Sequence, residues 1–219
     1  MACRVRGSLM GDCMNSLYLR LWMMLTGWGA VGLVYSLTSS QDQASAIMLQ
    51  PSAIDLWFDF DPNAIWLYLS FFPLVAMGYL LCPAQRLLWL ARSMQLSALG
   101  AGVVFIFWPT TMIFPPVTQD TISATTLKLL ISFDSLQNCL PSLHVTLTIL
   151  AVWALWQKHT PLRSLFIAVW GLAITVSILQ LHRHQFVDLL GGAVLAIAAG
   201  LLAQRILSRK ADKVAGQTT

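Results

Sequence analysis

Two histidine-containing stretches could carry acid–base or nucleophilic chemistry, and the first is "HRHQFVDL", residues 182–189. His184 and Asp188 are four residues apart, and an apolar run follows them. On a helix, residues with this spacing share one face. The carboxylate could then accept the Nδ1 proton of the imidazole, fix its tautomer and leave Nε2 free as a base or nucleophile. The alternative is that Asp188 only caps the first turn of a helix, and this stretch alone favours neither interpretation.

The second stretch is "NCLPSLHVT", residues 138–146. Pro141 and Ser142 are residue types that begin helices, so His144 is expected in a first helical turn. The free N–H groups of such a turn form a ready site for a phosphate. The alternative is a surface histidine at a helix start. Together the two stretches suggest phosphate chemistry.

The elements that position these residues are expected to be membrane helices. The 219 residues are 57% hydrophobic and only 10% charged, whereas a soluble domain carries about 25% charged residues. We therefore predict an all-α, polytopic membrane protein that forms a single membrane domain over residues 1–219, with a frayed polar tail at 208–219. Six apolar runs approach the length of a membrane span: Leu21–Leu37, Ala64–Cys82, Ser93–Phe114, Leu143–Trp156, Ser164–Leu181 and Gln185–Ala203.

The distribution of basic residues predicts the orientation of these six helices. One side of the predicted topology holds eleven of the thirteen Lys and Arg residues: Arg4, Arg6, Arg20, Arg86, Arg92, Lys158, Arg163, Arg205, Arg209, Lys210 and Lys213. The other side holds only Lys128 and Arg183, together with Asp42, Asp55, Asp59, Asp61, Asp120 and Asp134. By the positive-inside rule, both termini are cytoplasmic, and His144 and His184 lie together at the outer face. The net charge of +4 suits cationic membrane loops better than nucleic-acid binding, so no nucleic-acid partner is expected.

With these residues in view, the sequence resembles the type 2 phosphatidic acid phosphatase superfamily. Members carry Pro-Ser-x-His and, two helices later, His-x-x-x-Asp, which here read "PSLH" and "HQFVD". "FWPTTMIFPP", from Phe107, is similar to the branch that contains inositol phosphorylceramide synthase, whereas "IWLYLSFFPL", from Ile65, resembles bacterial relatives. The resemblance covers roughly Ile54 to Leu201, and it implies a bacterial inner-membrane protein with its site on the outer face.

The resemblance also implies roles for individual residues. His184 would attack phosphorus and form a phosphohistidine, and Asp188 would orient it. His144 would protonate the leaving oxygen and then activate the water or alcohol that releases the phosphoryl group. This chemistry needs no metal and no cofactor, and the substrate would be a phosphorylated lipid.

The sequence departs from the family where the phosphate should be held. Phosphatase members carry Lys-x6-Arg-Pro before Pro-Ser-x-His, and that motif is not found. They also have Arg six residues before the nucleophile, where this chain has Ile178. We therefore expect Arg183 to bind the phosphate, with Lys128 as second choice and the N–H groups near Ser142 as third. Asn138 and Asp134 shape the site or are simple turn residues.

Alternatives remain open for both the function and the site. The chain could be a lipid phosphatase, or a phosphotransferase that moves a phospho-headgroup between lipids. A transporter with a His–Asp proton relay is the third class, and the position of the ionisable residues at the outer edge argues against it. His144, His182, His184 and Asp188 could instead bind zinc. The four cysteines, Cys3, Cys13, Cys82 and Cys139, have neither disulfide nor zinc spacing. The lipid and the oligomeric state are not indicated.

Overall fold

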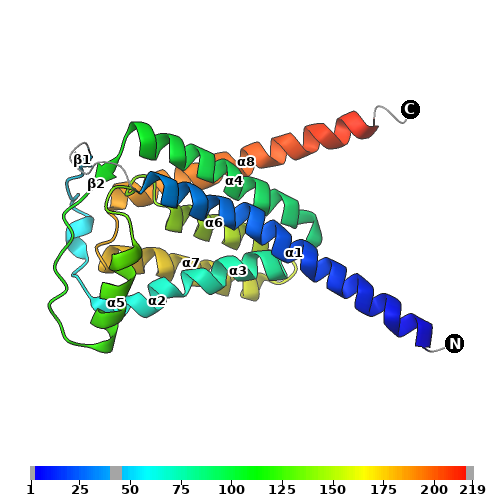
Figure 1. The fold of residues 1–219 in the computed structure, drawn as a ribbon, viewed down its shortest axis with the longest axis horizontal. Helices are drawn as coiled ribbons and strands as arrows, with labels where there is room; N and C mark the ends of the chain where they lie inside the picture. Colours follow the sequence, from blue (N-terminus) through cyan, green and yellow to red (C-terminus); the bar gives the residue numbers. More distant parts are fainter. Residues whose placement is uncertain (1–2, 40–45, 216–219) are drawn as a thin grey trace.

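The computed structural model describes residues 3–39 and 46–215. Asp42 lies outside the described residues, and so do the side chains of Cys3, Arg4, Arg6, Cys13 and Lys213. The chain is almost entirely helical (Figure 1). Its elements in order are α1 Cys3–Thr38, β1 Ile47–Met48, η2 Asp55–Trp57, η3 Pro62–Ala64, α2 Ile65–Leu69, α3 Phe71–Leu81, α4 Ala84–Phe107, β2 Thr110–Thr111, α5 Ile122–Phe133, α6 Leu143–Leu155, α7 Pro161–Gln180 and α8 Phe186–Ala215.

Helix α6 lies at the centre of the bundle. It packs against α3, α4, α7 and α8, while α1 covers α4 and α3 from outside (Figure 1). Most of its side chains are buried, which agrees with an apolar sequence on all sides of the helix. The site motif at its first turn is therefore held by a helix whose side chains are mostly buried.

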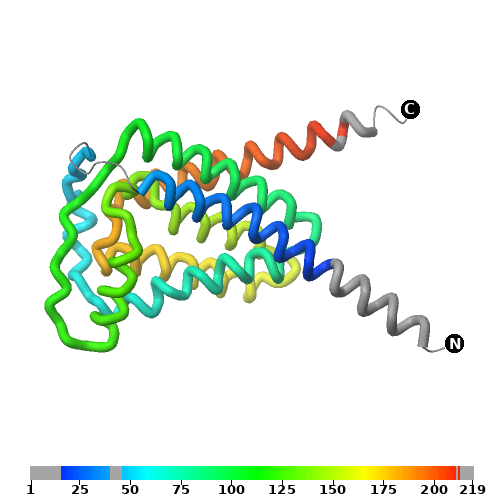
Figure 2. The backbone as a smooth tube through the Cα atoms, in the orientation of Figure 1, coloured from blue at the N-terminus to red at the C-terminus, as the bar shows by residue number. Residues whose placement is uncertain are grey.

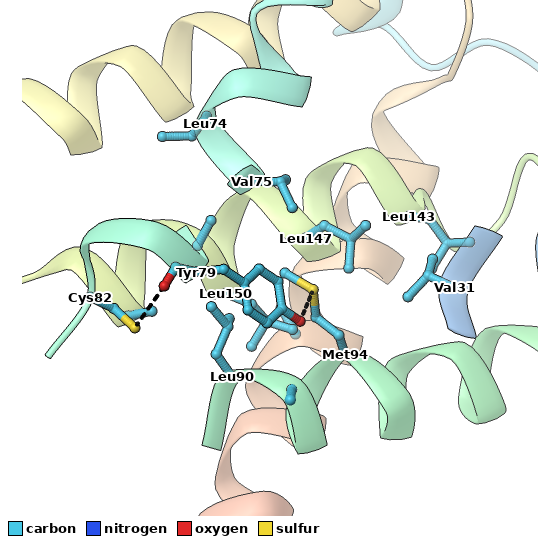
Figure 3. Packing of buried hydrophobic residues seen from close by; sticks show 14 of the residues in the cluster. Val31, Leu74, Val75, Tyr79, Cys82, Leu90, Met94, Leu143, Leu147 and Leu150 are labelled. Atoms are coloured by element: carbon cyan, nitrogen blue, oxygen red, sulfur yellow. Dashed lines mark hydrogen bonds between the residues drawn. The ribbon is translucent and has the colours of Figure 1, made fainter. Parts of the chain in front are cut away.

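The core between these helices is apolar and contains few polar atoms. In Figure 3, the Tyr79 ring of α3 lies among aliphatic side chains and its hydroxyl donates to Met94 Sδ of α4 at 3.1 Å. This contact satisfies the buried hydroxyl of a tyrosine that would otherwise lose its hydrogen bond to water. The surrounding side chains come from α3, α4 and α6: Leu74, Val75, Leu90, Leu147 and Leu150.

The outer surface of the bundle matches a membrane environment. Within the described residues, five helical segments are long and apolar enough to span a bilayer: Ser16–Thr38, Pro62–Leu81, Ala84–Phe107, Pro161–Gln180 and Phe186–Lys210. Helix α6 is apolar but only 13 residues long. Many large apolar side chains are exposed on the outer faces, among them Leu33, Leu99, Phe166, Leu172 and Val194. These features confirm the prediction of an all-α polytopic membrane protein.

The connections that build the site gather at one end of the bundle. Figure 2 shows α5 lying across this end, together with the segments that lead into α2 and α5. There β1 pairs in parallel with β2, with Ile47 opposite Thr110. Helix α8 ends at the opposite end of the bundle, where α1 begins (Figure 1).

The structure differs from the predicted elements in three places. The third run was expected at Ser93–Phe114, but α4 covers Ala84–Phe107. The additional residues of α4 include Arg86, whose Nη1 donates to the carbonyl of Trp153 at 2.9 Å and so satisfies a carbonyl at the end of α6. Pro109 ends α4 early, because the residue before a proline avoids the helical region. Helix α5 was not expected at all, and α8 continues to Ala215 through most of the polar tail.

Candidate active site

The turn between α7 and α8 carries His182, Arg183 and His184 and is fixed by hydrogen bonds. His182 adopts a left-handed conformation with φ of 47°, and its Nε2 lies 2.9 Å from the carbonyl oxygen of Phe58. The Asp188 carboxylate accepts from the N–H of Gln185 at 2.9 Å, as a capping residue at the start of α8 does. Because residues 181–185 form this turn rather than a helix, the Arg183 side chain is free to point into the bundle.

Asp188 also faces the imidazole of His184. The distance from His184 Nδ1 to Asp188 Oδ2 is 3.4 Å, longer than the about 3 Å of a good hydrogen bond. Both side chains are buried, with exposed fractions of 9% and 0%. Since Nδ1 faces the carboxylate, Nε2 lies on the opposite side of the ring. Asp188 therefore caps the start of α8 and also lies within ion-pair distance of the imidazole, without a hydrogen bond to Nδ1.

The starts of α6 and α8 are bound to each other. The N–H of Ser142 donates to the backbone carbonyl of Asp188 at 3.0 Å. The hydroxyl of Thr146 donates to the carbonyl of Gly192 at 2.9 Å. A Cβ at Gly192 would collide with the carbonyl oxygen of Ser142, so only glycine permits this approach. The sequence motifs meet because two helix N-termini are in direct contact.

This contact brings the two motif histidines side by side. The ring centroids of His144 and His184 are 5.9 Å apart, with the rings at 61°. The hydroxyl of Tyr68, on α2, lies 2.7 Å from His144 Nε2. The Phe71 ring packs edge-on against the His144 imidazole, with the ring centroids 4.9 Å apart. His144 is therefore held in one orientation by residues that sequence reasoning assigned no role.

Arg183 precedes His184 in the α7–α8 turn and is buried. Its side chain is 4% exposed, and its Nη2 lies 2.8 Å from Asp134 Oδ2. The guanidinium stacks over the Phe114 ring, 4.5 Å from the centroid. The Tyr35 hydroxyl donates to the other oxygen of Asp134. Burial alone would raise the pKa of the Asp134 carboxyl, but Arg183 and Tyr35 together hold that pKa below its usual value. Arg183 is thus buried in an ion pair and does not extend to the lipid headgroups.

The other residues expected to bind the phosphate lie in different places. Lys128 is on the exposed face of α5, where its Nζ donates to the carbonyl of Gln119 at 3.3 Å. Asn138 is buried, and its Nδ2 donates to Thr38 Oγ1 at 3.0 Å, which ties the loop before α6 to α1. Ser142 is buried beside the histidines. Ile178, at the position of the family arginine, is fully buried in an apolar cluster with Leu127 and Val145.

Several buried polar atoms around the histidines have no hydrogen-bond partner within the described part of the chain. The five in this region are Ser142 Oγ, Arg183 Nε, His184 Nδ1, Gln185 Oε1 and Asp188 Oδ1. Buried polar atoms without partners are rare in native structures, and a cluster of them marks a place where a polar ligand or water belongs. No group of three His, Cys or Asp side chains within reach of one metal ion occurs in residues 3–39 and 46–215, so the zinc alternative has no ligand cluster to support it.

Two cavities reach the histidine pair. The first has a volume of about 250 Å³ and is lined by His144, Tyr68, Tyr35 and Asp134 at its polar end. The second, about 260 Å³, is lined by residues of the segments that precede α2 and α5 and of the α7–α8 turn, including Asp55, His182, His184 and Gln185. Each histidine is therefore accessible from a different side.

The sequence pattern of the PAP2 superfamily matches residues 63–202, well over half of the chain. The chain belongs to the PAP2 superfamily. The match includes "PSLH", "HQFVD" and Tyr68, so the elements that form the histidine pair are the ones shared with the superfamily. It confirms the resemblance to type 2 phosphatidic acid phosphatases, whereas the branch stays a prediction. Comparison with curated proteins and with solved structures gave no match.

The PAP2 match leaves out two segments that contact the site. Asp55, in η2, accepts the N–H of Phe186 at 2.6 Å and so satisfies a second free group at the start of α8. Tyr35, in α1, hydrogen-bonds Asp134. Sequence reasoning missed both, because neither residue belongs to a motif and each meets the site only through tertiary packing.

Proposed function

We propose that this PAP2 protein is a lipid phosphatase that hydrolyses a phosphomonoester or pyrophosphate of a lipid at the outer face of the membrane. The observation that carries the proposal is the 5.9 Å separation of the His144 and His184 rings at the joined starts of α6 and α8. One phosphoryl group can contact both rings, since reacting atoms in a productive complex are about 3–3.5 Å apart. The His184–Asp188 contact supports His184 as the nucleophile.

In the first step, the lone pair of His184 Nε2 attacks phosphorus. The bond from phosphorus to the lipid oxygen breaks, and that oxygen leaves with the electron pair and takes a proton from protonated His144. In the second step, neutral His144 removes a proton from water. The water oxygen bonds to phosphorus, the phosphorus–nitrogen bond breaks, and its electron pair returns to His184. This is covalent catalysis with one general acid–base partner.

Charge on the phosphoryl oxygens requires compensation, and Arg183 is the residue we assign to it. Its Nη2 is occupied by Asp134, but a guanidinium carries five N–H donors and its Nε has no partner among the described residues. Arg183 can therefore keep its ion pair while donating to phosphate. The free N–H groups in the first turn of α6 add a second source of positive potential.

The test is phosphate release by the purified protein in vesicles containing phosphatidic acid, phosphatidylglycerol phosphate or a polyprenyl pyrophosphate. We expect release from at least one lipid, and a base-stable, acid-labile phosphoprotein when the lipid carries radioactive phosphate. His184→Ala should lose both signals. Phosphate release by His184→Ala at the wild-type rate would contradict the proposed nucleophile.

Phosphotransfer to a lipid alcohol is the second candidate. The observation that favours it is the pair of hydroxyls, Tyr35 and Tyr68, beside the His144 end of the first cavity, where an acceptor alcohol would have to bind. The same assay separates the two functions. A phosphatase releases free phosphate without acceptor, whereas a transferase forms a phospholipid product only when an alcohol such as diacylglycerol or ceramide is added.

A further inference from the structure

The first cavity has the form of a passage from the side of the bundle to His144. Its polar end holds His144, Tyr68, Tyr35 and Asp134, and all other lining residues are apolar or glycine. They come from α1, α3, α5 and α6 and include Gly32, Phe72, Phe133 and Leu147. A lining of this composition suits a hydrocarbon chain that ends in a polar group.

The cavity opens on a part of the surface that faces hydrocarbon. Gly32, Phe72 and Phe133 line it and are exposed. Gly32 belongs to the apolar span Ser16–Thr38 and lies six residues before its end. At 1.5 Å per residue this is about 9 Å along the helix axis, below the end of the span. An opening at this depth meets acyl chains rather than water.

We propose that this cavity binds the hydrocarbon chain attached to the leaving oxygen of the phosphorylated lipid, and that the chain enters sideways from the bilayer past Gly32. The inference rests on the proposed function. In an in-line displacement, the leaving oxygen lies on the side of phosphorus opposite His184, which is the side of His144. The lipid chain therefore extends away from His144, and the first cavity is the space that begins there.

The second cavity, which also has four polar lining residues, differs from the first in position. Asp55 lines it, and within the described residues this carboxylate accepts hydrogen bonds from Ser52 and Phe186 but has no cationic partner. Apart from Leu179, its lining residues belong to the connections at this end of the bundle rather than to the spans. This cavity therefore offers water a route to the histidines, whereas the first cavity begins within a span.

Gly32 provides a way to close the opening without disturbing the fold. A Cβ built at Gly32 meets nothing within 4 Å, so a large side chain there enters open space. Gly29, on the same helix, is a matched control. It is exposed as well, its nearest atom is Leu25 Cδ1 at 3.6 Å, and it does not line the cavity.

The kinetic experiment compares Gly32→Phe with Gly29→Phe. For each protein, kcat/KM is measured for the lipid that the wild type dephosphorylates fastest and for water-soluble p-nitrophenyl phosphate. We expect the ratio of lipid to p-nitrophenyl phosphate kcat/KM to fall at least tenfold in Gly32→Phe and to stay at the wild-type value in Gly29→Phe. An unchanged ratio in Gly32→Phe would overturn the proposal.

A labelling experiment tests the cavity independently of turnover. The protein is placed in phosphatidylcholine vesicles with a phosphatidic acid that carries a diazirine in one acyl chain, and is then irradiated. Leu147 is only 2% exposed, so a chain can label it only from inside the cavity. We expect adducts on Leu147 in the wild type and Gly29→Phe, and at least tenfold fewer in Gly32→Phe. Absence of Leu147 adducts in the wild type, or equal labelling in Gly32→Phe, would overturn the inference. If no lipid is dephosphorylated, the proposed function fails, while this labelling still decides the cavity.

Discussion

Replacement of Arg183 tests whether this residue binds phosphate or only stabilises the fold. Removal of a single donor to a developing oxyanion costs about 3–4 kcal/mol, a factor of roughly 10²–10³ in kcat. We therefore expect Arg183→Ala to lower kcat/KM at least a hundredfold. The same change leaves Asp134 buried without its cation, and loss of one partner of a buried ion pair costs about 3–5 kcal/mol of stability. A loss of activity could then reflect unfolding alone.

The double variant Arg183→Ala/Asp134→Asn resolves this ambiguity. It removes the stranded charge, so its thermal unfolding midpoint should recover most of the loss seen in Arg183→Ala. If Arg183 binds phosphate, turnover stays at least a hundredfold low despite the restored stability. Asp134→Asn alone leaves the guanidinium in place and should keep most of the activity at pH 7.

The assay is phosphate release with a thermal unfolding curve for every variant. Lys128→Ala is the matched control, because it also removes a cation from this end of the bundle. The Lys128 side chain is exposed and donates to the carbonyl of Gln119. It should retain wild-type turnover. Recovery of both stability and turnover in the double variant would refute the assignment of Arg183 to phosphate binding.

Four further predictions concern the histidine pair and its supports. His184→Ala should abolish turnover with an unchanged unfolding midpoint, while Asp188→Asn, which corrupts the tautomer but keeps the shape, should retain measurable activity. Tyr68→Phe should lower kcat and shift one limb of the pH–rate profile, because it frees His144 Nε2; an unchanged profile would limit Tyr68 to packing. Gly192→Ala should lower both stability and turnover by separating α6 from α8, and a circular dichroism melt identical to that of the wild type would contradict this. The depressed pKa of Asp134 stabilises the fold above its unfolded-state pKa of about 3.9, so the difference in stability between wild type and Asp134→Asn should shrink as the pH falls below about 4.

The sequence was sufficient to identify the histidine motifs of the site, but not the residues that contact those motifs from distant parts of the chain. Both histidine motifs were identified because each combines helix-start residues with a titratable group over a few positions. Asp55 and Phe186 are 131 residues apart, and Tyr68 and His144 are 76 apart. No periodicity or spacing encodes such contacts, because they depend on how the helices pack.

The helix boundaries show the same limit. The third span was predicted to begin at Ser93, but α4 begins at Ala84 and includes Arg86, whose guanidinium donates to carbonyl groups at the end of α6. Helix α6 is about 20 Å long at 1.5 Å per residue, and Arg86 contacts the end opposite His144. This confirms that Arg86 belongs to the other side of the bundle, and it leaves Arg183 as the buried cation near the histidines among the described residues.

The joined starts of α6 and α8 have a consequence for how the protein comes to be active during synthesis. His144 lies on α6, whereas His184 and Asp188 come later in the chain, with α8. A nascent chain that has inserted α1 to α6 holds the proposed acid–base residue and the Tyr35–Asp134 contact, but lacks the proposed nucleophile. Insertion of α8 brings His184 and, through the Asp188 carbonyl, the partner of the Ser142 N–H. Assembly of the site therefore waits for α8, and chains that have not yet inserted this helix are expected to be inactive toward the surrounding lipid.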